Sequence, residues 1–183
     1  TYWRFIGHEV RFEDLVYESK RLIAQTSLSG ELQVLANRID RLSESDRRTR
    51  DFTQAGLREA LTEVVSCFPV YRSYIEHGRV SPEDRQHVTW AISQAKRRTA
   101  ARDHHIYDFI QSVLLLEPQN RTDPALSSAM VDFVLRFQQF SAPVTAKGLE
   151  DTAFYSYCRL LSHNDVGGDP RRFSVSVPAF HHQ

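Results

Sequence analysis

The chain has 183 residues, of which 41% are hydrophobic and 25% are charged, and this suits one globular domain or one large subdomain. Lys and Arg together number 23, as do Asp and Glu, so the formal net charge is zero. Balanced charge argues against nucleic-acid binding, which normally requires a basic excess, and excludes long-range steering of a charged ligand. A neutral ligand such as a sugar is compatible with it.

The cysteines and the apolar runs indicate the compartment. Cys67 lies in an apolar run and is expected to be a buried thiol, and two cysteines are too few for a disulfide scaffold. No apolar run approaches the ~18 residues of a membrane span, and no signal peptide is present. We therefore expect a cytoplasmic protein without membrane contact. Because the first residue is Thr1 and the only methionine is Met130, we expect a piece of a longer protein.

The first part of the chain carries the pattern of amphipathic helices. Apolar residues spaced three, four and seven apart predict helix from Phe12 to about Ser43, either continuous or as two helices meeting near Ser29-Gly30. The following segment, 43–51, is rich in charged residues and is expected to be a connector.

Further helices have start signals of their own. Thr53 is a candidate N-cap, and Ser81-Pro82 combines a capping hydroxyl with a proline suited to the first helical turn. Asp123-Pro124 opens the last long helix. The expected helices after the connector are 54–67, 82–98, 103–116 and 124–140.

The helical pattern stops at residues 142–146, Ala-Pro-Val-Thr-Ala. This segment is short and apolar, contains β-branched residues, and is followed by Lys147-Gly148. This pattern predicts a buried strand over 142–147 with a polar tip. Asp151 or Thr152 is expected to cap a helix that continues to about Ser162, and a loop should follow. The predicted fold class is therefore mainly α, with at most one or two short strands near 142–147.

Polar candidates for a binding site follow this strand. Lys147 and Glu150 could hydrogen-bond sugar hydroxyls, because α/β barrels build their sites at this end of a strand, although a solvated surface pair is the alternative. Asp151 beside Glu150 could take part in acid–base chemistry, but N-capping explains it without chemistry.

Aromatic residues and a Gly-Gly turn extend the candidate site. Phe154, Tyr155 and Tyr157 could stack on sugar rings. Phe154 and Tyr157 share a helix face, so a core position is favoured for Phe154, whereas Tyr155 is left open. Asn164 and Gly167-Gly168 could approach a ligand closely, or could simply close the helix.

A loop and two histidine pairs complete the candidates. Tyr71 and Arg72 follow the helix over 54–67 and could bind a ligand, although an ion pair that locks two loops is the favoured use of the arginine. His104-His105 and His181-His182 are not expected to hold a metal, because adjacent side chains point apart on a helix. No metal or other cofactor is expected.

A resemblance to one enzyme family covers nearly the whole chain. Its most specific part is residues 143–170, PVTAKGLEDTAFYSYCRLLSHNDVGGDP, which is similar to the most distinctive segment of the maltooligosyl trehalose synthases of the α-amylase clan. Further anchors are LVYESKRLI (15–23), ELQVLANRIDRL (31–42), DRRTRDFT (46–53), CFPVYRSYI (67–75) and WAISQAKRR (90–98). The sequence departs from the family pattern at Cys158, where Asn is usual.

The resemblance implies a longer parent built on a (β/α)8 barrel. Residues 1–141 would be a helical insertion subdomain, and residues 142–183 a barrel strand, helix and loop that contribute to the substrate cleft. The three catalytic carboxylates are implied to lie outside this chain, so no catalytic role is assigned within it. Lys147 and Glu150 match positions implied to line the cleft. The full set of candidate substrate-binding residues is Lys147, Glu150, Tyr155, Tyr71, Arg72 and Asn164.

The implied reaction is an intramolecular transglucosylation. It would convert the reducing-end α-1,4 linkage of a maltooligosaccharide to an α,α-1,1 linkage, without a cofactor and through a covalent glycosyl-enzyme. The implied partners are the maltooligosaccharide and the remainder of the barrel, and the chain alone should be inactive. Two alternatives stay open: a stand-alone helical protein-interaction module without catalysis, and a hydrolase of the same clan.

Overall fold

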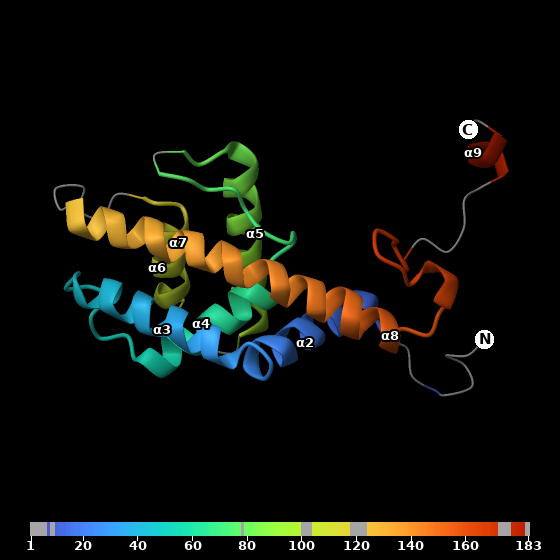
Figure 1. Ribbon diagram of the computed structural model, residues 1–183, viewed down its shortest axis with the longest axis horizontal. Helices are drawn as coiled ribbons and strands as arrows, with labels where there is room; N and C mark the ends of the chain where they lie inside the picture. The colour runs from blue at the N-terminus through green and yellow to red at the C-terminus, as the bar shows by residue number, and fades with distance from the viewer. Residues whose placement is uncertain are drawn as a thin grey trace.

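A computed structural model describes residues 7, 10–77, 79–99, 104–117, 124–171 and 177–181, which form a predominantly helical fold (Figure 1). Apart from an isolated bridge between Glu76 and Arg79, this part of the chain contains no β structure. The prediction of a mainly α fold is therefore confirmed. The elements are α2 (Phe12–Gln25), α3 (Ser29–Glu44), α4 (Gln54–Ser66), α5 (Pro82–Arg98), α6 (His105–Leu114), α7 (Pro124–Thr145), the π-helix η1 (Ala146–Ala153), α8 (Phe154–Ser156), the 3-10 helix η2 (Leu161–His163) and α9 (Val177–His181).

The amphipathic stretch over 12–43 folds as two helices, which is one of the two predicted arrangements. At the end of α2 the Thr26 hydroxyl donates to the Leu22 carbonyl at 2.7 Å. This bond competes with continuation of the helix, and α3 begins at Ser29, next to the predicted Ser-Gly break. Both helices turn most of their apolar residues toward the core, whereas Leu22 and Val34 are exposed.

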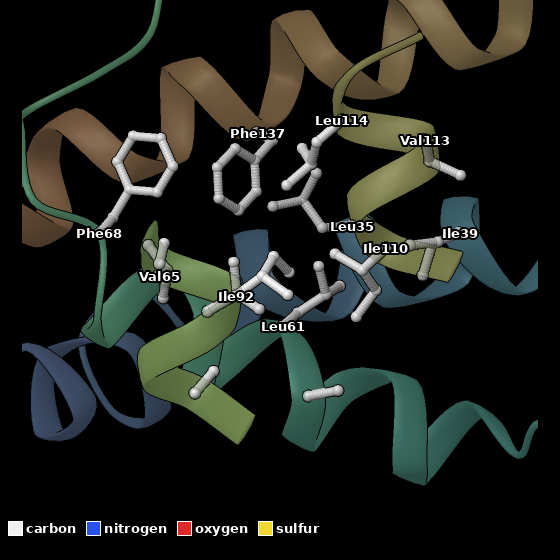
Figure 2. Packing of buried hydrophobic residues seen from close by; sticks show 14 of the residues in the cluster. Leu35, Ile39, Leu61, Val65, Phe68, Ile92, Ile110, Val113, Leu114 and Phe137 are labelled. Atoms are coloured by element: carbon white, nitrogen blue, oxygen red, sulfur yellow. The ribbon is translucent and has the colours of Figure 1, made fainter. Parts of the chain in front are cut away.

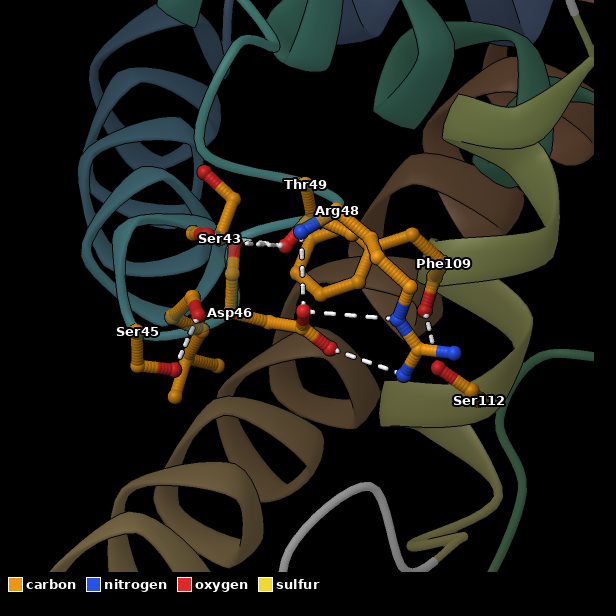
Figure 3. Close-up of polar contacts among 8 residues, drawn as sticks. Ser43, Ser45, Asp46, Arg48, Thr49, Phe109 and Ser112 are labelled. Atoms are coloured by element: carbon orange, nitrogen blue, oxygen red, sulfur yellow. Dashed lines mark hydrogen bonds and ion pairs between the residues drawn. The ribbon is translucent and has the colours of Figure 1, made fainter.

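The charged connector after α3 is a hydrogen-bonded turn (Figure 3). The Thr49 hydroxyl donates to the Ser43 carbonyl at 2.8 Å, and Nη2 of Arg48 lies 3.0 Å from Oδ2 of Asp46. The Arg48 guanidinium also holds the pKa of the Asp46 carboxyl below its ordinary value. Figure 3 shows the turn beside Phe109 of α6. The turn therefore fixes how the chain passes from α3 to α4.

The predicted N-caps of α4 and α5 are confirmed. The Thr53 hydroxyl accepts from the Gly56 amide at 3.1 Å, and the Ser81 hydroxyl accepts from the Asp84 amide at 3.0 Å. Pro82 occupies the first turn of α5, where its missing N–H costs no intrahelical bond. Helices α6 and α7 also form where they were expected, although the predicted start residues of both, at positions 103 and 123, lie outside the described residues.

The main core lies between α3, α4, α5, α6 and α7 (Figure 2). The Phe68 and Phe137 rings meet edge to face with their centroids 5.5 Å apart. Burial of each large side chain stabilises the fold by roughly 1.5–3 kcal/mol. The largest fully buried apolar side chains are those of Phe133, Phe137, Leu32, Ile39, Leu57, Leu61, Ile75, Ile92, Ile110, Leu114 and Val64.

The predicted strand over 142–147 is wrong, because this segment is helical. Helix α7 covers residues 142–145 and η1 begins at Ala146, so that the two form one continuous rod in Figure 1. Phe133, Phe137, Phe140 and Val144 are buried at spacings of four, three and four, so the helical pattern continues into the segment. A strand without neighbouring strands would leave its backbone groups unpaired, whereas a helix pairs them internally.

Pro143 is tolerated inside α7 for a local reason. A proline in a helix leaves the carbonyl four residues earlier without its hydrogen bond. In α7 that carbonyl belongs to Gln139, which is exposed, so water can donate to it. The cost of the proline is therefore lower than it would be on the buried side of the helix.

The irregular segment between α4 and α5 is held by buried side chains of α7. The Gln138 amide donates to the Ile75 carbonyl at 3.1 Å and accepts from the Ile75 N–H at 2.8 Å. The Ser141 hydroxyl donates to the Tyr71 carbonyl at 3.0 Å. These bonds fix the backbone on which the Tyr71 side chain is mounted.

Gln138→Leu should lower the free energy of unfolding by about 2 kcal/mol, because it leaves both backbone groups of the buried Ile75 unpaired. Gln33→Leu is the matched control, since among the described residues Gln33 bonds only the side chain of Asn37 on the surface of α3. It should change stability by less than about 0.5 kcal/mol. Urea denaturation of both variants checks this. Equal unfolding midpoints for the two variants would contradict the role assigned to Gln138.

Candidate functional site

The candidate residues lie on two segments that the fold brings together. One is the irregular segment after α4, and the other is the rod that starts with η1. Isolated turns of π-helix occur frequently at functional sites, and η1 is an unusually long example. Tyr71 and Arg72 lie on the first segment, Lys147, Glu150 and Tyr155 on the second, and Asn164 follows η2.

Tyr71 and Glu150 are in direct contact, although 79 positions separate them. The Tyr71 hydroxyl donates to Oε1 of Glu150. This hydrogen bond, together with partial burial, raises the pKa of Tyr71 to about 12, so the phenol keeps its proton at neutral pH. Tyr71 remains 43% exposed. The pair therefore presents a neutral hydroxyl and a carboxylate together on an accessible surface, which suits hydrogen bonding to sugar hydroxyls.

Arg72 does not lock two loops through an ion pair within the part of the chain that the structure describes. Its guanidinium carbon lies 4.5 Å from the centroid of the Tyr74 ring, and its Nε donates to the Ser73 carbonyl at 3.4 Å. Tyr74 was not among the candidates, yet it is 68% exposed. Arg72 thus supports an exposed aromatic ring next to the Tyr71–Glu150 pair in the chain.

Lys147 and Tyr155 are accessible, and no side chain of the described residues holds either of them by a hydrogen bond or ion pair. The Lys147 side chain makes no hydrogen bond or ion pair with any described residue, so it does not pair with Glu150. Tyr155 is 83% exposed. Both side chains are free to meet a ligand, and their binding roles stay predictions.

The predicted N-cap at Asp151 or Thr152 is wrong. Both residues lie inside η1, and the chain is already helical from α7 onward, so no helix begins there. The Thr152 hydroxyl donates to the Lys147 carbonyl, five residues earlier, at 2.9 Å. The expected helix to about Ser162 also ends early, because α8 stops at Ser156.

Phe154 occupies the core, as favoured from the sequence, and Tyr157 joins it. The Phe154 ring stacks on Phe12 with centroids 5.9 Å apart, and the Tyr157 ring lies 5.1 Å from the same Phe12. Asn164 supports this cluster, because its Nδ2 donates to the carbonyls of Phe154 and Tyr157. Its Oδ1 is buried without a hydrogen bond to the described residues.

The Gly-Gly pair is explained by the turn it forms. Gly167 has a φ of +82°, a conformation that favours glycine, and the Gly168 N–H donates to the Asp165 carbonyl at 2.7 Å. A Cβ at Gly168 would lie 2.6 Å from the His163 carbonyl oxygen. The glycines are therefore required by the turn itself.

Sequence reasoning missed Lys20, although a signal was present. Tyr17 and Ala24 are buried, and Lys20 lies three residues after one and four before the other, which places it on the apolar face of α2. Lys20 is only 3% exposed, and its Nζ donates to the Phe68 carbonyl at 2.7 Å. Burial lowers the pKa of Lys20 to about 8, an effect that Cys67 opposes.

The part of the chain that the structure describes holds neither a metal site nor a membrane-spanning helix. Within the described residues, no group of three or more His, Cys, Asp or Glu side chains could hold a metal ion. None of the described helices has the length and apolar character needed to cross a bilayer.

Comparison with known proteins shows which proteins are similar to this chain in sequence and in structure. No family model matches the chain. A putative maltooligosyl trehalose synthase of Mycobacterium tuberculosis is 51% identical over 49 residues, which are 27% of this chain and 6% of that protein. The solved structure of maltooligosyltrehalose synthase from Arthrobacter ramosus is 30% identical in sequence and superimposes with a TM-score of 0.71. The match covers 98% of this chain and 20% of the Arthrobacter ramosus chain.

A third relative agrees in fold. The solved structure of a DSM5389 glycosyltrehalose synthase has a TM-score of 0.58 and 23% sequence identity. The match covers 99% of this chain and 18% of the glycosyltrehalose synthase chain. The resemblance inferred from the sequence is confirmed by these matches. The chain spans about a fifth of the length of the solved structures it resembles.

Proposed function

We propose that the chain is part of a maltooligosyl trehalose synthase and supplies one wall of its substrate cleft. The similarity to the Arthrobacter ramosus enzyme over 98% of this chain supports this proposal most strongly. Because the chain spans only 20% of that enzyme, the activity is proposed for the protein at its full length. The alternative of a stand-alone interaction module gains no support from this match.

The proposed reaction converts the reducing-end α-1,4 linkage of a maltooligosaccharide into an α,α-1,1 linkage. After the first bond is broken, the released glucose must stay bound and turn over before it attacks the glycosyl-enzyme. Water that reached the intermediate first would give hydrolysis instead. The residues that hold the glucose and exclude water therefore decide between transfer and hydrolysis.

The Tyr71–Glu150 contact is the feature of the site that supports this role. The carboxylate can accept from two sugar hydroxyls, and the phenol can accept from another while it donates to Glu150. The exposed Lys147 ammonium and the exposed Tyr155 ring would add a donor and a stacking surface. In this proposal residues 142–183 supply most of the sugar contacts, and residues 1–141 support them and add the Tyr71 hydroxyl. Helix α7 runs without a break across residues 141 and 142.

The cytoplasm is the proposed location. Both cysteines, the buried Cys67 and the exposed Cys158, are free thiols, as expected for a reducing compartment. The proposed partners are a maltooligosaccharide and the remainder of the barrel.

In the protein at full length, Glu150→Gln should lower the rate of trehalose-unit formation by about tenfold and raise the share of free glucose. The physical reason is that a neutral amide accepts more weakly from sugar hydroxyls than a carboxylate does. Lys147→Ala should also raise the share of free glucose relative to trehalose-ended products. The assay separates trehalose-ended products from glucose after incubation with maltopentaose.

Glu18→Gln is the matched control, because Glu18 is an exposed glutamate of α2 outside the candidate set. It should leave both the rate of trehalose-unit formation and the share of free glucose unchanged. If Glu150→Gln and Lys147→Ala behave like Glu18→Gln, the proposed role of this site is wrong.

A further inference from the structure

A cleft of about 470 Å³ lies between α2, the end of α4, α5 and the junction of α7 with η1. We call it the Lys20 cleft. None of the six candidate sugar-contact residues lines it. Its walls combine an apolar surface, which includes the half-exposed Trp90, with polar side chains such as Gln94 and Thr145.

Lys20 is the cation in this cleft whose charge is not matched by a carboxylate. Arg98 pairs with Asp14 at 2.8 Å, and Arg171 pairs with Asp169, also at 2.8 Å. No carboxylate of the described residues forms an ion pair with Lys20, whose only hydrogen bond there is to a backbone carbonyl. Two of its three N–H donors are therefore unused within this part of the chain. Lysine is almost never this deeply buried unless it is paired.

Thr145 is a second unsatisfied group in the same cleft. It lies at the end of α7, is 4% exposed, and its hydroxyl is buried without a hydrogen bond to the described residues. A buried hydroxyl without a partner costs about 1–3 kcal/mol, so a partner is expected. Lys20 and Thr145 line one cleft, and both carry buried polar hydrogens for which the described residues do not supply enough acceptors. This points to a ligand that brings oxygen acceptors.

We propose that the Lys20 cleft binds a small organic anion, whose carboxylate or phosphate oxygens accept from Lys20 Nζ and the Thr145 hydroxyl while its apolar body rests against Trp90. A neutral sugar would satisfy the hydrogen bonds but would leave the buried positive charge unpaired. An anion satisfies both. The carboxylate that lines the cleft, Glu13, is exposed, and its Oε1 lies 3.6 Å from Nη1 of Arg171, which it shares with Asp169. This inference does not depend on the proposed trehalose chemistry.

Isothermal titration of the full-length protein tests the proposal with benzoate, its neutral analogue benzamide, and inorganic phosphate. We expect saturable binding of benzoate or phosphate, with no binding of benzamide. Binding of phosphate alone would identify a phosphate-bearing ligand, and binding of benzoate alone would identify a carboxylate with an apolar body. Binding of neither anion, or equal binding of benzamide and benzoate, would overturn the proposal.

Substitutions locate the binding. Lys20→Met and the nearly isosteric Thr145→Val should each weaken anion binding at least about tenfold, which equals about 1.4 kcal/mol. Lys96→Met should leave binding unchanged, because Lys96 pairs with Asp108 and does not line the cleft. Thr145→Val keeps the test decisive if Lys20→Met does not fold. Unchanged affinity in Thr145→Val would overturn the assignment of the cleft.

Discussion

Gly148→Ala should lower the free energy of unfolding of the 183-residue chain by about 3 kcal/mol. A Cβ at this position would lie 2.7 Å from Cγ, 2.8 Å from Cα and 2.9 Å from N of Lys20. Two of these atoms belong to the backbone of α2, so a side-chain rotation cannot relieve the clash. We expect η1 to move away from α2 and to loosen the packing of Phe154 on Phe12, which urea denaturation and near-UV circular dichroism would detect.

Gly30→Ala is the control, because a Cβ at Gly30 meets no atom within 4 Å. Gly30 lies in the first turn of α3, where alanine has the higher helix propensity, so this variant should be neutral or more stable by up to about 1 kcal/mol. If Gly148→Ala is as stable as Gly30→Ala, the close approach of η1 to α2 is not a feature of the folded chain.

Lys20→Met should reveal a pH-dependent contribution of about 3 kcal/mol to stability. Burial lowers the pKa of Lys20 to about 8 in the folded chain, whereas in the unfolded chain the pKa has its ordinary value of 10.5. Between these values the unfolded state binds more protons, so the free energy of unfolding rises with pH. The difference between 10.5 and about 8, at about 1.36 kcal/mol per pH unit, gives this magnitude.

The measurement compares wild type with Lys20→Met from pH 7 to pH 10.5. The stability of wild type relative to the variant should rise steadily across this range. Cys67 acts in the opposite direction, because burial raises its pKa to about 11, but its contribution is common to both chains and largely cancels. A flat difference for Lys20→Met would mean that Lys20 is not buried.

Most helices of the fold were predictable because their signals are local. Thr53 and Ser81 predict the starts of α4 and α5, because the hydroxyl of an N-cap residue accepts from an amide three residues later. Both hydrogen bonds are present in the structure. The wrong prediction of a strand over 142–147 also has a local cause. Val144 and Thr145 are β-branched and Pro143 interrupts helices, yet the spacing of Phe137, Phe140 and Val144 already carried the helical period.

The candidate site was less predictable, because contacts between distant segments make it. Tyr71 and Glu150 were each candidates, but nothing local indicates that a bond joins them across 79 positions. That bond depends on Gln138 and Ser141, which hold the Tyr71 segment against α7. The position of Lys20 on the apolar face of α2 could have been noticed, whereas its bond to the Phe68 carbonyl required the fold.

The decisive measurement is the product that the full-length protein forms from maltopentaose. We predict that reducing ends disappear while the number of glucose units stays constant, and that NMR detects a new α,α-1,1 linkage. Release of glucose with a matching gain of reducing ends, or no change in the sugar, would contradict the assignment of this chain to a trehalose-forming enzyme.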